Sequence, residues 1–118
     1  MTSPLEATVR TEADGARITL TGRVDRDGDD ALASAYAAAR ATGSGPVTLD
    51  FTGAGYINST GIALIVRLLA EARRDHREVI AIGLSEHYRE IFRITRLSDY
   101  LTIADAQPAR IVPEEAAR

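Results

Sequence analysis

Cysteine, lysine and tryptophan are all absent from this chain of 118 residues. Without cysteine there is no disulfide, no thiol catalysis, no iron–sulfur cluster and no cysteine-bound zinc. Without lysine there is no Schiff-base chemistry and no P-loop lysine. The 14 basic residues, all arginine, are outnumbered by 17 acidic ones, which gives a net charge of −3. Nucleic-acid binding is therefore not expected, because it depends on a basic face.

Histidine and long apolar runs are also scarce. The two histidines, His76 and His87, have charged neighbours and no further ligand residues at metal-binding spacing, so no metal site is expected. The longest apolar run, residues 62–66, is far shorter than the roughly 20 residues of a membrane span. The N-terminal residues show no secretory signal, so we expect no membrane insertion and a cytoplasmic location.

What the chain does contain is typical of one globular domain. It is 45% hydrophobic and 26% charged, and it shows no internal repeat. We expect a single domain over residues 1–118, with an ordered core at about 5–105. Residues 106–118 are rich in proline, alanine and charge and are expected to form a frayed tail.

The hydrophobic pattern predicts alternating strands and helices. Residues 5–10 and 17–21 alternate apolar and polar side chains around a turn, as in a β-hairpin. Aspartates at 27–30 offer N-caps for a helix with apolar positions at 32, 35, 36 and 39. The later elements are expected as a strand at 47–51 that 56–57 can extend, a helix at 61–75, a strand at 78–84, a helix from 85–86 and a strand at 100–103.

The resulting order is β-β-α-β-α-β-α-β. A hairpin followed by strand–helix alternation predicts an α/β fold, with a mixed central sheet and helices packed on it. No nucleophile elbow, Gly-rich phosphate loop or His-containing triad can be assembled, so neither catalysis nor a cofactor is expected. Asp27, Asp29 and Asp30 do not fit a calcium loop and are interpreted as solvated capping residues.

One segment, residues 50–61, combines polar residues with the entry into an apolar helix. Asn58, Ser59 and Thr60 fall where a helix has free N–H groups and a positive dipole end. As a purely structural cap, Asn58 or Ser59 would be the N-cap and Gly61 would ease the tight entry. That interpretation leaves unexplained the two adjacent hydroxyls and the wide apolar face of the helix, which is either deeply buried or kept for a partner.

This segment resembles the signature of the STAS domain, a family named for sulfate transporters and anti-sigma factor antagonists. The family pattern is a strand ending in Asp-x-Ser/Thr, a short loop, Asp-Ser-Ser/Thr-Gly and an apolar helix. Here it corresponds to Asp50-Phe51-Thr52, then Asn58-Ser59-Thr60-Gly61. Gly22-Arg23-Val24-Asp25 and residues 88–98 resemble two further family elements, so the resemblance covers nearly the whole chain.

The resemblance implies a regulatory binding protein. Free-standing STAS domains of this size resemble antagonists that bind an anti-sigma factor, which is also a serine/threonine kinase, and so free the sigma factor. The kinase then phosphorylates the antagonist, and a phosphatase reverses the modification. The family's acceptor is the hydroxyl residue before the motif glycine, which is Thr60 here, with Ser59 as a minor alternative.

Two motif positions depart from the family pattern. Asn58 stands where aspartate is usual, which keeps a capping side chain but removes a carboxylate next to the acceptor. The acceptor is threonine where serine is commoner. Asp25 is expected beside the loop, either shaping the kinase-docking surface or capping a helix. The expected partner face comprises Arg23, Asp25, Asn58, Ser59, Thr60, Gly61, Ile62, Ala63 and Val66.

Two other functions are compatible with the same residues. One is a STAS interaction module that is not phosphorylated and works in a signalling assembly or beside a transporter. The other is a small enzyme or nucleotide-binding protein that uses residues 58–61 as an anion cradle at a helix N-terminus.

Overall fold

The computed structural model describes residues 3–13 and 15–104, so the tail expected at 106–118 lies outside the described residues. In chain order the elements are β1 (Glu6–Glu12), β2 (Gly15–Val24), the 3₁₀ turn η1 (Arg26–Gly28), α1 (Asp29–Arg40), β3 (Val47–Ile57), α2 (Ser59–Arg74), β4 (Val79–Ile82), α3 (Glu86–Ile94), the 3₁₀ turn η2 (Leu97–Asp99) and β5 (Thr102–Ile103).

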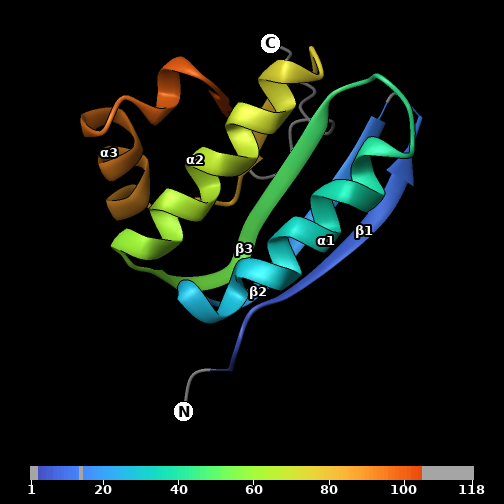
Figure 1. Cartoon of the computed structure of the whole chain (residues 1–118). Helices are drawn as coiled ribbons and strands as arrows, with labels where there is room; N and C mark the ends of the chain where they lie inside the picture. Colours follow the sequence, from blue (N-terminus) through green and yellow to red (C-terminus); the bar gives the residue numbers. More distant parts are fainter. Residues whose placement is uncertain (1–2, 14, 105–118) are drawn as a thin grey trace, which may run out of the picture.

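The five strands form one mixed sheet in the order β1-β2-β3-β4-β5. β1 and β2 pair antiparallel, and the following pairs are parallel. Because the parallel strands follow one another across the sheet, right-handed crossovers bring their helices to the same face. Figure 1 shows α1 and α2 side by side in front of the strands. The predicted α/β class, with helices on a mixed sheet, is confirmed.

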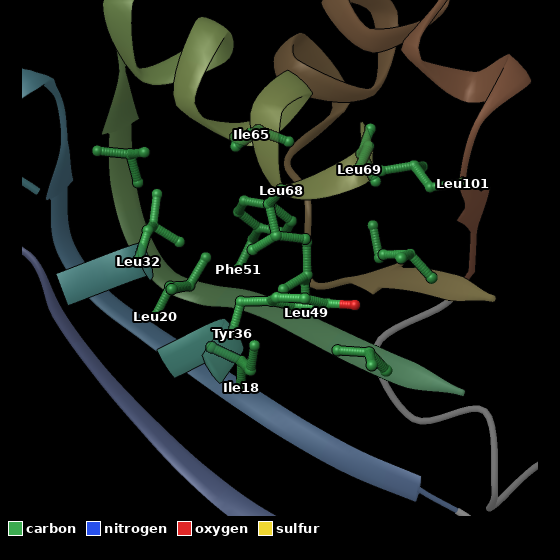
Figure 2. Close-up of a cluster of buried hydrophobic side chains, with 14 of the residues drawn as sticks. Ile18, Leu20, Leu32, Tyr36, Leu49, Phe51, Ile65, Leu68, Leu69 and Leu101 are labelled. Carbon is green, nitrogen blue, oxygen red and sulfur yellow. The ribbon is translucent and has the colours of Figure 1, made fainter. Parts of the chain in front are cut away.

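The core lies between the sheet and these helices. Along the first six residues of β2 and the first half of β3, buried and half-buried residues alternate, so only one face of the sheet is fully covered there. The rings of Phe51 and Phe92 meet edge to face at 5.8 Å and attach α3 to this core. Figure 2 shows its centre, formed by Ile18, Leu20, Leu32, Tyr36, Leu49, Phe51, Ile65, Leu68, Leu69 and Leu101.

β3 is longer than its sequence pattern suggests. Alternation of buried residues stops at Phe51, and Ala54 and Ile57 are then buried at a spacing of three. The register of β3 against β2 shifts in the same region, between Thr19 and Thr21 and again before Arg23. At each shift β3 has one residue more than the β2 segment it pairs with. β3 can therefore continue as one strand up to the start of α2.

The entry into α1 differs from the N-caps predicted at 27–30 but agrees with the interpretation of Asp25 as a helix cap. Asp25, and none of the aspartates at 27–30, provides the capping carboxylate: it accepts a hydrogen bond from the Asp27 N–H at 3.1 Å and starts η1. α1 itself begins one turn later, with Gly28 in the N-cap position. Near the other end of the chain, the strand predicted at 100–103 is shorter in the structure. η2 occupies residues 97–99, and β5 contains only Thr102 and Ile103.

Candidate functional site

The N-terminus of α2 is fixed by its own cap and by the end of β2. The Asn58 Oδ1 accepts a hydrogen bond from the Gly61 N–H at 2.8 Å, so Asn58 is the N-cap. The Asn58 N–H donates to the Val24 carbonyl at 3.2 Å. The cap and this backbone contact therefore determine where the following residues, Ser59 and Thr60, lie.

Gly61 is required by close packing at the same point. A Cβ at this position would lie 2.0 Å from the Val24 carbonyl oxygen, which is far inside van der Waals contact. Gly61 is buried, whereas the two hydroxyl residues before it are exposed. The motif glycine thus lets the helix start directly against β2, and that contact leaves Ser59 and Thr60 on the surface.

Thr60 shares an open hollow with the loop that follows β2. The hollow is lined by Thr60, Asn58, Asp25, Arg26 and Asp27. The structure therefore brings Asp25 and Thr60 to one place although they are far apart in the sequence, as the resemblance implies. Arg26 and Asp27 were not expected here, because their sequence neighbourhood indicates only a helix start.

The hollow carries charges of both signs, because Asp25 and Asp27 line it together with Arg26. Arg23 Nε donates a hydrogen bond to Asp25 Oδ2 at 2.8 Å, and this bond lowers the pKa of the Asp25 carboxyl below its ordinary value. Asp25 therefore caps η1 and is also ionised at neutral pH. By contrast, α2 has no acidic residue in its first turn, so its positive dipole end faces the hollow with only a neutral cap.

Part of the expected partner face lies on the surface. Ala63 is exposed and Val66 is 46% exposed, while Ile62 is half-buried and packs against the core. Tyr56, also 46% exposed, lies two residues before the N-cap and was not predicted. The signal that could have identified Tyr56 is its aromatic ring close before the motif, because aromatic residues are enriched at binding hot spots.

Tyr88 is a second residue that sequence reasoning did not connect with the site. Its hydroxyl accepts a hydrogen bond from the Ile57 N–H at 2.9 Å. Ile57 ends β3 beyond the stretch that pairs with β4, so α3 supplies the partner that the sheet lacks there. The helical pattern of residues 88–95 predicts only that Tyr88 faces the core, and nothing in it reveals where the hydroxyl bonds.

Residues 3–13 and 15–104 contain neither a metal-binding cluster nor a membrane-spanning helix. No three histidine, aspartate or glutamate side chains gather there in a way that could hold a metal ion. None of the helices among these residues has both the length and the apolar character needed to cross a bilayer.

Comparison with known proteins gives a family match and several relatives. A family model described as "Mlab, STAS domain" matches residues 7–104. Anti-sigma-B factor antagonists from Listeria monocytogenes and Listeria innocua are each 32% identical over 59 residues, which is 50% of this chain and 52% of theirs. The chain thus matches about half the length of these curated relatives.

Solved structures share the whole fold at low identity. An anti-sigma factor antagonist from Mycobacterium paratuberculosis superposes with a TM-score of 0.72 at 14% identity, covering 87% of this chain and 89% of the other. The antagonist SpoIIAA in its unphosphorylated form gives 0.67 at 15% identity, covering 87% and 91%. The phosphorylated Bacillus SpoIIAA gives 0.65 at 16% identity, covering 90% and 96%.

Proposed function

The chain belongs to the STAS domain family, and from that premise we propose that it is an anti-sigma factor antagonist switched by phosphorylation of Thr60. In its unmodified state it binds an anti-sigma factor that is also a serine/threonine kinase. The names of the curated relatives and of the solved structures support this class of function. The chain then acts as a regulatory binding protein and as a substrate of its partner, without chemistry of its own.

The exposed Thr60 hydroxyl at the start of α2 is the observation that carries the proposal. It lies on the surface, in the first turn of a helix without acidic residues there, and it lines the same hollow as Asp25. A partner kinase can reach it without unfolding the domain. Transfer of the γ-phosphoryl group of ATP to Thr60 Oγ1 releases ADP and leaves a phosphate at the positive end of the helix.

The same geometry explains how the phosphate would weaken binding. A phosphothreonine adds about 1.5 to 2 negative charges. Asp25 and Asp27 line the hollow together with the cation Arg26, so the phosphate would shift its charge toward negative. A partner packed against Ala63 and Val66 would have to accept this charge at the edge of an apolar contact. The domain tolerates the phosphate at its helix end, whereas the interface does not.

The test compares wild type with Thr60→Glu and Thr60→Ala as bait in lysate from the native host. We expect wild type and Thr60→Ala to retain an ATP-dependent kinase and Thr60→Glu to lose it. The recovered kinase should then add one phosphoryl group to wild type, at Thr60 by mass spectrometry, and none to Thr60→Ala.

Two matched variants control for charge. Ser44→Glu places the same charge on another exposed hydroxyl position, in the loop before β3, and should bind like wild type. Ser59→Glu tests the neighbouring hydroxyl as the alternative acceptor. Retention of the kinase by Thr60→Glu, or phosphorylation of Thr60→Ala at the wild-type rate, would rule out the Thr60 switch.

A STAS module that binds without phosphorylation is the second candidate, and Asn58 favours it. The family's aspartate would place a carboxylate beside the acceptor, whereas Asn58 contributes a neutral amide that only caps the helix. Such a module, in a signalling assembly or beside a transporter, would keep the same partners with Thr60→Glu. The bait comparison therefore separates the two functions.

A further inference from the structure

The outer edge of β1 is long and regular. β1 is the first strand of the sheet, and among the described residues its seven positions pair with β2 without a register break. It contains no proline and no bulge, which are common ways to protect an edge. The opposite edge is β5, which has only two residues. β1 is therefore the edge whose unpaired backbone groups can accept another strand.

The charges of β1 are arranged for pairing with a copy of itself. Glu6, Thr8 and Arg10 share one face of the strand, and both charged residues are exposed. If two β1 strands pair antiparallel around Thr8, Glu6 of each copy lies opposite Arg10 of the other. Moving the centre to Val9 would instead place Glu6 opposite Glu12, and like charges directly opposite are unfavourable. Of these two registers, the charges favour the one centred on Thr8, which pairs Glu6 with Arg10 twice.

Among the described residues, Arg10 forms a long ion pair, to Glu12. Its register neighbour in β2 is Arg17, which carries the same charge. Glu12 approaches Arg10 at 3.5 Å but approaches Arg17 Nε at 2.8 Å, and the Arg10 side chain is 73% exposed. Glu6 from a second copy would supply the carboxylate that Arg10 needs, on the side of the strand that β2 does not occupy.

The helix above this edge has small side chains on its outer flank. Ala33, Ala37 and Arg40 of α1 line the groove toward α2. The flank turned away from α2 carries Ala31, Ser34 and Ala38 instead, and the last two are exposed. Figure 1 shows α1 lying along the same side of the molecule as β1. Small residues on this flank allow two α1 helices to approach closely when their sheets join.

From these observations we propose that the chain forms a two-fold dimer by antiparallel pairing of β1 with β1 of a second copy, centred on Thr8. The two sheets become one continuous sheet, and the two α1 helices pack across the axis. The edge uses none of the residues of the proposed partner face. A dimer therefore presents two copies of the Thr60 site, and the inference stands independently of the proposed function.

Charge reversal with complementation tests the register. Sedimentation velocity of wild type, up to millimolar concentration, should show a reversible monomer–dimer equilibrium. Glu6→Arg and Arg10→Glu each turn two attractive pairs into two repulsive ones, so each variant alone should dimerise at least about tenfold more weakly. An equal mixture should recover dimers of wild-type affinity. In the mixed dimer one chain carries arginine at both positions, and it faces a chain that carries glutamate at both.

The mixture also controls for folding, since a misfolded variant cannot be rescued by a second one. Thermal unfolding of each variant provides an independent check, because both side chains are exposed. A wild type that stays monomeric at millimolar concentration would overturn the proposal. A dimer that both charge reversals leave unchanged would place the contact elsewhere, and two weakened variants without recovery in the mixture would exclude the Thr8-centred register.

Discussion

The N-termini of α1 and α2 lie in one corner of the molecule, where η1, which leads into α1, contacts α2, but the two helices compensate their dipoles differently. α1 has glycine in its N-cap position, without a side-chain hydrogen bond, and carries Asp29 and Asp30 in its first turn. α2 has the neutral N-cap Asn58 and no acidic residue in its first turn. The negative charge at α1 is permanent, whereas α2 has hydroxyls at the equivalent place. The difference leaves the start of α2 without a carboxylate of its own, which is where the proposed phosphorylation of Thr60 would add negative charge.

The glycines at the two helix starts differ as well. A Cβ on Gly28 would lie 2.7 Å from the Leu5 Cδ2, which is the end of a side chain that can rotate, and 3.1 Å from the Leu5 Cβ, which can give only by a small shift of the backbone. A Cβ on Gly61 would lie 2.0 Å from a backbone oxygen of β2, which cannot move without disturbing the sheet. The start of α2 is therefore held rigidly against the strand, while the start of α1 rests on a side chain that can adjust.

Replacing these glycines should produce the largest effect. We expect Gly61→Ala to lower the free energy of unfolding by about 3 kcal/mol, since the methyl group forces α2 away from the Val24 carbonyl. Gly28→Ala should cost less, about 1 to 2 kcal/mol, because a rotamer change relieves the contact with Leu5 Cδ2 and a small shift relieves the one with its Cβ. Urea unfolding of both variants measures the difference. Equal losses would show that the two helix starts are packed with the same rigidity.

Changing the cap or the charge at either helix end should have a smaller effect on the free energy of unfolding. Asn58→Ala removes the cap of α2 and should cost about 1 kcal/mol. Asn58→Asp keeps the cap, adds a carboxylate at the dipole end, and should raise the free energy of unfolding by about 0.5 kcal/mol. Asp30→Asn at α1 is the reciprocal change and should lower it by a similar amount. A destabilising Asn58→Asp would mean that repulsion from Asp25 and Asp27 exceeds the dipole attraction.

Much of this corner was predictable from the sequence. The alternation at 17–21 has the period of a strand and the apolar spacing at 32–39 has the period of a helix. The existence of β2 and α1 and their order along the chain could therefore be predicted. The motif at 58–61 was located by its polar residues before an apolar helix and by its family resemblance. The pairing of Asp25 with this loop followed only from the resemblance, since nothing local links residues so far apart.

The unpredicted features depend on tertiary contacts. The register shifts in β3 are set by β2, so the burial period of three after Phe51 has no cause within the strand itself. Ile62 and Val66 are both apolar residues of α2, and only the position of the sheet decides that Ile62 is the more buried. Tyr88 bonds to Ile57 because β4 ends early there.

The smallest expected effect is the pH dependence of stability that Asp25 contributes, because the ionisation of its carboxyl is coupled to folding. The hydrogen bond from Arg23 lowers the pKa of Asp25 in the folded chain below the ordinary 3.8. A depressed folded-state pKa contributes stability that is fully present above the unfolded value and is lost as the pH falls through the folded one. Asp25→Asn keeps an oxygen to cap Asp27 but loses this charge. It should therefore be less stable than wild type at neutral pH, and the gap should close as the pH drops below about 3.8.

The same measurement in an Arg23→Gln background identifies the source of that gap. Without the guanidinium, Asp25→Asn should change the pH dependence of the unfolding free energy much less, because the main cause of the lowered pKa is gone. A gap between wild type and Asp25→Asn that persists unchanged into strong acid would show that packing, and not the charge, makes the difference. If the gap closes as expected, Asp25 is ionised and paired with Arg23 before Thr60 is modified. Under the proposed switch, a phosphate on Thr60 would then add charge beside a carboxylate that Arg23 already balances, and a partner packed against the start of α2 would have to accept that added charge.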